Sequence, residues 1–378
     1  MVGMKRYLHA SIEDDLAKKM VLLTGPRQVG KTFLAKEIAK KYIHPQYLNY
    51  DAKDDATIIQ SKFWNTHTDL LIFDEIHKMH TWKPFLKGTF DTRSPNQHIL
   101  VTGSSRMETF RQTGESLAGR YFHYRLHPLS VCELKSQMSP HTAVEQLNRL
   151  GGFPEPFLSG SETEAARWRN QYYTDLIRED IVEYSRIHEI RGMRLLVEML
   201  RKRVGSPLSY SSLARDLQIA PNTIRKYVDI LESLLIVFTV RPYHTNIARS
   251  ILKEPKLYFF DSGFVMGDEG IRLENTVAAC LLKHTQFLQD TQGKTIELNY
   301  IRTKEDHEVD FALTQDGRLQ TFIEVKLTDP NPSANLRYFM GHYDGVQGIQ
   351  LVHNLRQAQT RDGIQINPAG SWLSELSA

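Results

Sequence analysis

The sequence predicts an α/β protein of several domains, with a mostly parallel sheet in the first of them. In the first third of the chain, short apolar segments alternate with amphipathic segments of helical period. This alternation is typical of a parallel sheet covered by helices. A charged helical region follows, and the last third returns to strand-like segments. With 378 residues, the chain is also too long for one ordinary hydrophobic core.

The first part of the chain carries the elements of the parallel sheet. We expect a helix over residues 31–42, directly after a glycine-rich turn. The expected strands are residues 20–24, 46–51, 70–74, 98–102 and 121–126. Their apolar residues and flanking polar turns indicate strands buried on both faces.

Three regions of different character follow this sheet. The first is helical, with a Gly-Gly-Phe-Pro break at residues 151–154, and the second has a helix–turn–helix pattern. The last has an α-β-β-β-α-β order, expected as helix 274–284, strands 295–302, 308–313 and 319–326, helix 332–343 and strand 348–353. The predicted domains are therefore 1–135, 136–203, 204–262 and 263–378.

The composition is that of a globular protein, with 41% hydrophobic and 24% charged residues. A net charge of +3 implies no general attraction to nucleic acid, so such contacts require local basic patches. Cys132 and Cys280 lack the spacing of a metal site. No apolar run is long enough for a signal peptide or a membrane span. We expect a cytoplasmic protein without a membrane partner.

Residues 25–32, GPRQVGKT, match the P-loop pattern in full and lie between the first strand and the first helix. Glycines let backbone N–H groups surround phosphates, and the helix N-terminus adds a favourable dipole. Lys31 is predicted to neutralise the β- and γ-phosphates, and the Thr32 hydroxyl to bind Mg²⁺. The predicted ATP-binding residues are Gly25, Pro26, Arg27, Gln28, Val29, Gly30, Lys31 and Thr32.

The strand at residues 70–74 ends in a pair of carboxylates, Asp74 and Glu75. Downstream of a P-loop, this pattern is typical of a Walker B motif. Asp74 is predicted to bind the magnesium ion together with Thr32, and Glu75 to polarise the attacking water. The adjacent acidic residue favours hydrolysis of the nucleotide over its storage.

Two further polar residues follow the later strands of this sheet. Ser104 lies just after the strand at 98–102, a position that resembles the sensor-1 strand of AAA+ ATPases. It is predicted to orient the attacking water. Arg120 precedes the strand at 121–126 and has two interpretations. It could act as an arginine finger toward a neighbouring subunit, or it could pair with a surface carboxylate.

Together these motifs resemble a family of bacterial and archaeal AAA+ ATPases. The matching segments are GPRQVGKT at 25–32, LLIFDEI at 70–76, TGSS at 102–105 and AGR…L-x-PLS at 118–130. GGFPE at 151–155 resembles the start of the family's helical lid. The resemblance covers nearly the whole chain. It implies an AAA+ fold, ATP with Mg²⁺, homo-oligomers formed through the AAA+ domains, and a C-terminal region of unassigned function.

Residues 209–231 read as two short helices joined by a Gln-Ile-Ala turn, with Pro221 in the first turn of the second helix. Ile224, Val228 and Leu231 share its apolar face. With residues 235–240 and 256–260 as a wing, the pattern resembles winged helix domains. The predicted DNA contacts are Asn222, Thr223, Arg225, Lys226 and Tyr227. A structural spacer or a protein-binding surface remains the alternative.

The C-terminal strands carry a pattern similar to the core of PD-(D/E)xK nucleases. Glu324 and Lys326 fall on one strand face, and a hairpin would bring Asp310 beside them. Glu274, on the preceding helix, is a further candidate ligand. Asp310, Glu324 and Glu274 are predicted to bind Mg²⁺, and Lys326 either to hold the phosphate or to lower the pKa of the attacking water. The usual proline before the aspartate is absent, because Val309 stands there. A degenerate, non-cleaving nuclease fold remains the alternative.

Three functions are consistent with these motifs. The leading hypothesis is an ATP-hydrolysing protein that binds DNA and processes it with its C-terminal carboxylates. The second is a nucleotide-dependent signalling switch, in which the winged helix only transmits movement. The third is a non-catalytic DNA-binding regulator that uses ATP to set its oligomeric state.

Overall fold

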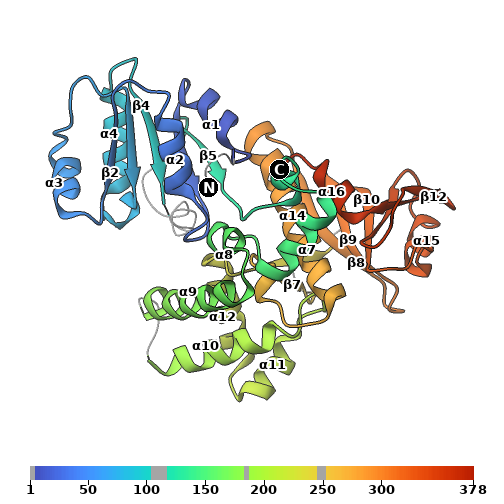
Figure 1. Cartoon of the computed structure of the whole chain (residues 1–378). Helices are drawn as coiled ribbons and strands as arrows, with labels where there is room; N and C mark the ends of the chain where they lie inside the picture. Colours follow the sequence, from blue (N-terminus) through green and yellow to red (C-terminus); the bar gives the residue numbers. More distant parts are fainter. Residues whose placement is uncertain (1–4, 104–116, 183–186, 245–252) are drawn as a thin grey trace. The chain divides into compact units, whose positions relative to one another are not determined.

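The computed structural model describes residues 5–103, 117–182, 187–244 and 253–378. Residues 1–127 and 128–378 form two compact units, and each is described by itself. The elements are labelled in Figure 1. Among the described residues, no helix is both long and apolar enough to cross a membrane.

The first unit contains a parallel sheet of five strands in the order β2-β3-β4-β1-β5. The strands are β1 (Met20–Thr24), β2 (Pro45–Asn49), β3 (Leu70–Asp74), β4 (His98–Thr102) and β5 (Tyr121–Arg125). The parallel sheet predicted from the alternating pattern is confirmed. All residues of β1 and β3 are buried, as expected for strands covered on both faces.

The helices of the first unit are α1 (His9–Leu16), α2 (Lys31–Ala39), α3 (Lys53–Ser61), the 3₁₀ turn η1 (Ile76–Lys78) and α4 (Trp82–Thr92). The predicted helix at 31–42 forms but ends at Ala39. Phe85 and Leu86 of α4 pack against Phe73 of β3 in one buried apolar cluster. This burial supplies much of the driving force for the unit, at about 25 cal/mol for each Å² of apolar surface.

The helical part of the second unit begins at Pro128. Its helices are α6 (Val131–Leu134), α7 (Pro140–Leu150), α8 (Pro154–Ser159), α9 (Glu162–Val182), α10 (Ile187–Leu200), α11 (Tyr210–Leu217) and α12 (Pro221–Ser233). Ser139 caps α7 by accepting a hydrogen bond from the Thr142 amide, and Pro140 occupies its first turn. Helices α11 and α12 confirm the two helices predicted at 209–231, with Ile224 and Val228 buried.

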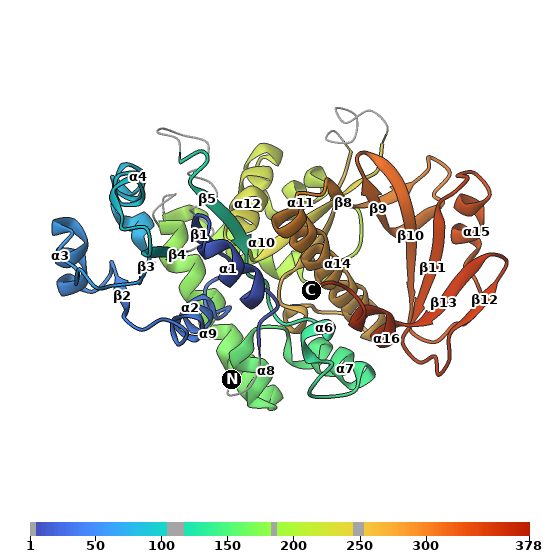
Figure 2. The same cartoon turned by 90° about the horizontal axis from the view of Figure 1, so that it is seen from above.

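The second unit also contains a mixed sheet of eight strands in the order β12-β13-β11-β10-β9-β8-β6-β7. They are β6 (Val237–Pro242), β7 (Lys256–Phe259), β8 (Ile296–Arg302), β9 (Glu308–Gln315), β10 (Arg318–Lys326), β11 (Gln347–Val352), β12 (Gln359–Arg361) and β13 (Ile364–Pro368). Helices α14 (Glu269–Gln292) and α15 (Ala334–Met340) lie on opposite sides of this sheet (Figures 1 and 2). The 3₁₀ turn η3 (Ser262–Phe264) precedes α14, and α16 (Ala369–Ser374) ends the unit.

The predicted wing is connected to the C-terminal sheet. Strands β6 and β7 pair antiparallel, as the sequence predicts for a wing. Strand β6 also pairs with β8 through Arg241 and Pro242. All the predicted domain boundaries stay predictions, including the one between residues 262 and 263. The eight-stranded sheet contains strands from both sides of that boundary, because β6 pairs with β8.

A buried ion pair joins the helical part of the second unit to the loop after β7. The Arg169 guanidinium lies 2.9 Å from the Asp261 carboxylate, and it also donates to the carbonyl of Leu150. Gly151 has a φ of +80°, and a Cβ there would lie 1.8 Å from the Asp261 carboxylate. Glycine is therefore required at this position of the Gly-Gly-Phe-Pro break.

Candidate functional site

The backbone of the predicted P-loop has two positions that only glycine suits. Gly25 has a φ of +153°, and a Cβ there would lie 2.3 Å from the carbonyl oxygen of Leu126. Gly30 has a φ of +101° and forms the N-cap of α2. The loop therefore turns directly into the helix N-terminus, where unpaired backbone N–H groups favour an anion.

The Lys31 side chain folds back onto its own loop. Its ammonium donates to the carbonyl oxygens of Gly25 at 2.9 Å and Pro26 at 2.6 Å. Burial lowers the pKa of Lys31 to about 8, while the charges of Glu75 and Asp74 oppose this shift. A buried ammonium that is satisfied only by neutral carbonyls would gain free energy from an anion placed beside it.

Asp74 is the centre of a hydrogen-bond network that joins residues of β2, β3, β4 and α2. The Thr32 hydroxyl donates to its carboxylate at 2.8 Å, Tyr47 at 2.6 Å and Thr102 at 2.6 Å. The amide of Glu75 donates at 3.1 Å. Asp74 and Thr102 are register partners in the parallel β3–β4 pair, which fixes this geometry. The predicted proximity of Thr32 and Asp74 is confirmed.

Glu75 has a strained backbone conformation beside this network. Its φ of +54° lies in the left-handed region, which costs a non-glycine residue about 1–2 kcal/mol. Burial raises the pKa of its carboxyl group, and Lys31 opposes the shift. The His77 ring lies 3.6 Å from the same carboxylate. Strain of this kind clusters at functional sites, and a raised pKa suits a proton acceptor.

The other two predicted residues of the first unit have different outcomes. Ser104 lies outside the described residues, so its role stays a prediction. The Arg120 guanidinium forms a two-pronged ion pair with Asp91, at 2.8 and 2.9 Å. This is the surface pairing that the sequence allows as an alternative to an arginine finger, and the finger role stays a prediction.

Helix α12 exposes most of the predicted DNA contacts. Asn222, Arg225 and Lys226 are exposed and Thr223 is half-buried, all in the first two turns. Tyr227 requires a correction, because its side chain is only 3% exposed and lies against Gly192 of α10. Its aromatic ring belongs to the core between the helices, so it is not available to DNA.

The C-terminal carboxylates converge on the β9–β10 hairpin. Asp310 accepts a hydrogen bond from the amide of Val325 at 2.9 Å, and Lys326 lies 2.7 Å from Glu324. The second carboxylate oxygen of Glu324 is buried without a hydrogen-bond partner. The hairpin geometry predicted for Asp310, Glu324 and Lys326 is therefore confirmed.

A lysine that the sequence analysis did not select lies among the neighbouring carboxylates. The Lys256 ammonium is 2.7 Å from Glu308 and 3.7 Å from both Glu274 and Asp310, and its side chain is only 1% exposed. Burial alone would lower the pKa of Lys256, but the three carboxylates raise it above its ordinary value. Glu274 also accepts a hydrogen bond from the Tyr258 hydroxyl at 2.8 Å.

The three predicted magnesium ligands differ in their contacts. Asp310 and Glu324 offer carboxylate oxygens, including the unpartnered one, which suits a small cation that keeps several waters. Lys256 and Tyr258 both contact the Oε1 atom of Glu274, and its role as a metal ligand stays a prediction.

Segments of both units match known protein families. Residues 17–135 match the AAA domain family. Residues 141–272 and 269–372 match two families that are each described as a domain of unknown function, DUF8612 and DUF4143.

The relatives of the chain are similar over most of its length. An uncharacterised protein of Mycobacterium tuberculosis is 29% identical over 332 residues, which cover 84% of this chain and 73% of the relative. An uncharacterised protein of Methanocaldococcus jannaschii is 22% identical over 358 residues, which cover 86% of this chain and 78% of the relative.

Among solved structures, a Walker-type ATPase of Pyrococcus abyssi aligns at 17% identity and a TM-score of 0.44, covering 68% of this chain and 93% of that one. RuvB of Thermotoga maritima aligns at 19% identity and a TM-score of 0.31, covering 61% and 86%.

The residues of the AAA domain fit the nucleotide and metal that its motifs imply. Thr32 offers a hydroxyl and Asp74 a carboxylate within 2.8 Å of each other, the two oxygen donors that Mg²⁺ takes from such sites. The Lys31 ammonium and the start of α2 offer positive charge for phosphates. When bound, Mg²⁺ would neutralise the phosphate charge.

Several members of these sites were not predicted from the sequence. In the AAA domain these are Tyr47, Thr102 and His77, and in the carboxylate cluster Lys256, Tyr258 and Glu308. Thr102 could have been found, because it ends the strand next to the predicted Walker B strand, and His77 and Glu308 lie two residues from predicted site residues. Tyr47, Lys256 and Tyr258 depend on contacts between segments that the sequence pattern does not pair.

Burial and the charge of Asp310 raise the pKa of Glu274 to about 8 and that of Glu324 to about 7. Below pH 4.5, these groups are protonated in both the folded and the unfolded state. Between pH 4.5 and about 7 to 8, the unfolded state releases protons that the folded state still holds, so stability falls as pH rises through this range. Replacing Glu274→Gln removes one charge and should flatten this loss.

We expect the melting temperature of wild type to fall relative to the Glu274→Gln variant as pH rises from about 5 to 8. Calorimetry of the full chain in matched buffers measures the difference. Glu162→Gln, which changes an exposed carboxylate, is the control and should follow wild type. A constant offset between Glu274→Gln and wild type across this pH range would contradict the assignment.

Proposed function

We propose that this chain hydrolyses ATP in its AAA domain and binds DNA through the second unit. The observation that carries the first part is the Asp74 network, which brings the Thr32 hydroxyl, a buried carboxylate and the phosphate-binding loop together. Lys31 and the N-terminus of α2 would bind the phosphates. Glu75, one residue after Asp74, would accept the proton of the attacking water.

The position of Glu75 supports hydrolysis over simple nucleotide storage. Its left-handed backbone directs the chain away from β3 immediately after Asp74. The Glu75 side chain is 26% exposed, so water reaches it, while its raised pKa makes it a better proton acceptor than an ordinary carboxylate. His77 lies close enough to orient this carboxylate.

Two substitutions should separate ATP binding from hydrolysis. Lys31→Ala removes the positive charge that faces the phosphates and should abolish ATP binding. Glu75→Gln keeps the shape of the side chain but not its basicity. It should bind ATP as wild type does and release phosphate about 100-fold or more slowly. Equilibrium binding of a fluorescent ATP analogue and phosphate release in Mg²⁺ measure the two steps.

Glu37→Gln, a half-buried carboxylate on the same helix as Lys31, is the matched control and should leave both measurements unchanged. Phosphate release by Glu75→Gln at the wild-type rate would exclude Glu75 as the proton acceptor. It would leave the binding assignment of Lys31 intact.

The DNA-binding part of the proposal rests on the exposed start of α12. Arg225 and Lys226 project from the second helix of a helix–turn–helix, the element that enters the major groove in such motifs. Other basic residues nearby are less available. Arg201 pairs with Glu198, and Arg203 pairs with Asp216.

Replacing Arg225→Ala together with Lys226→Ala should weaken binding of duplex DNA. The slope of log affinity against log salt concentration should become shallower by about two, one for each lost phosphate contact. Fluorescence anisotropy with labelled duplexes at several salt concentrations measures both effects. Lys40→Ala with Lys41→Ala, which removes two exposed charges from the end of α2, is the control. Equal DNA affinity and salt slope in wild type and the α12 variant would contradict the assignment.

Cleavage of DNA is a second candidate activity, favoured by the convergence of Asp310, Glu324 and Lys326. The Lys256 ammonium favours the non-cleaving alternative, because it already supplies a positive charge among three carboxylates. The same labelled DNA, incubated with Mg²⁺ with and without ATP, distinguishes the two. Products that disappear in Asp310→Ala would establish cleavage. Intact duplex, single-stranded and branched DNA would favour a regulator or a nucleotide-dependent switch.

The remaining parts of the proposal concern assembly and location. Homo-oligomers through the AAA domains would place Arg120 near the nucleotide of a neighbouring subunit. Arg120 would then have to exchange its pairing with Asp91 for a phosphate. We place the protein in the cytoplasm, where ATP and DNA are both available.

A further inference from the structure

A cluster of two histidines and one glutamate lies in the second unit, apart from the carboxylates of the β9–β10 hairpin. His141 and Glu145 are four residues apart at the start of α7, and His353 directly follows β11. One ligand atom of each residue lies within 4.8 Å of the others. Within the described ranges, this is the one group of three or more His, Cys, Asp or Glu residues with that geometry.

Both elements that carry the cluster are held firmly. The backbone amide of His353 donates to the carbonyl of Lys326 at 3.0 Å, which extends the β10–β11 pairing by one residue. Helix α7 begins at a capped turn, and Gly370 of α16 packs so closely on it that a Cβ there would lie 2.5 Å from the carbonyl oxygen of Pro140. Metal sites need ligands presented by such rigid elements.

One ring nitrogen of His353 lacks a hydrogen-bond partner. The residue is 8% exposed, and its Nδ1 atom is buried without a hydrogen-bond partner. A buried polar atom without a partner costs about 1–3 kcal/mol. Burial, and then the neighbouring His141, lower the pKa of His353, so its imidazole is neutral and keeps a lone pair at neutral pH. The His141 and His353 rings stack at 4.4 Å.

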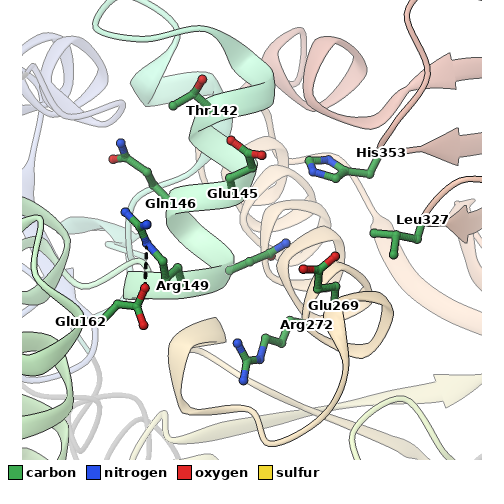
Figure 3. A pocket seen from close by; sticks show the side chains of 10 residues that line it. Thr142, Glu145, Gln146, Arg149, Glu162, Glu269, Arg272, Leu327 and His353 are labelled. Carbon is green, nitrogen blue, oxygen red and sulfur yellow. Dashed lines mark ion pairs between the residues drawn. The ribbon is translucent and has the colours of Figure 1, made fainter.

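The cluster borders a cavity of about 440 Å³ (Figure 3). Figure 3 shows the Glu145 carboxylate and the His353 ring turned toward each other at its edge. Arg272 also lines the cavity, and its Nε atom is buried without a hydrogen-bond partner. The cavity is thus polar, and it leaves room for a further ligand beside Glu145 and His353.

We propose that His141, Glu145 and His353 bind a transition-metal cation of the Zn²⁺ class. Two imidazoles and one carboxylate are a ligand set that Zn²⁺ takes in open sites, where water or a small ligand completes the tetrahedron. The carboxylate partly neutralises the cation, and the cavity supplies the open position. The two rings stack nearly parallel, so binding one ion requires them to turn until both lone pairs face it. Mg²⁺ prefers oxygen ligands and does not suit this set.

The test uses the full chain, stripped of metal with a chelator and titrated with Co²⁺ and then with Zn²⁺. We expect one Co²⁺ per chain with the strong visible absorption of a four-coordinate site, displaced by Zn²⁺. His141→Ala and His353→Ala should each weaken the binding by about tenfold or more. His141 is exposed, so its variant tests the site even if the buried His353 is needed for folding.

His342→Ala is the control, since it removes an exposed histidine from the same unit outside the cluster. It should bind Co²⁺ as wild type does. The proposal is overturned if wild type shows no four-coordinate Co²⁺ spectrum, or if His141→Ala gives the same spectrum and affinity as wild type. Neither outcome depends on ATP hydrolysis or DNA binding.

Discussion

The hydrogen bonds to the buried carboxylate of Asp74 are the interaction on which the candidate nucleotide site depends. Removing a carboxylate from water costs several kcal/mol, and charge-assisted hydrogen bonds offset part of that cost. Here three hydroxyls and one amide converge on it from β2, β3, β4 and α2. The network therefore holds the Thr32 hydroxyl where a metal ion would be bound. It also holds the backbone of Glu75, whose amide donates to the Asp74 carboxylate.

In the second unit, buried charged side chains are stabilised by ion pairs with each other. Asp261 is paired with Arg169 below Gly151, and Lys256 is surrounded by Glu308, Glu274 and Asp310. A buried pair contributes specificity more than stability, because its attraction and its desolvation nearly cancel. The lysine among the carboxylates bears directly on function, since it supplies the positive charge that a metal ion would otherwise bring. That is the physical reason to favour DNA binding without cleavage.

Local patterns predicted most of the elements that position these sites. Glycine spacing and apolar strand ends identified the P-loop and the Asp74 strand, and strand period 2 placed Glu324 and Lys326 together, because these signals are contained in short segments. Long-range contacts were not accessible in the same way. Tyr47 reaches Asp74 from a strand whose sequence shows no motif, and Lys256 lies 54 residues before Asp310. Tyr227 occupies an amphipathic helix, and its burial depends on the packing of α10.

The central claim is that the Asp74 network organises a site that hydrolyses ATP. The most direct measurement is phosphate release from ATP in Mg²⁺ by wild type and by Asp74→Asn, with ATP binding measured on the same samples. We expect turnover by wild type and a loss of about 100-fold or more in the variant, because its amide is uncharged and has one oxygen in place of two for the metal ion and the hydroxyl groups. Equal turnover in both proteins, or none in wild type under conditions where it binds ATP, would contradict the account.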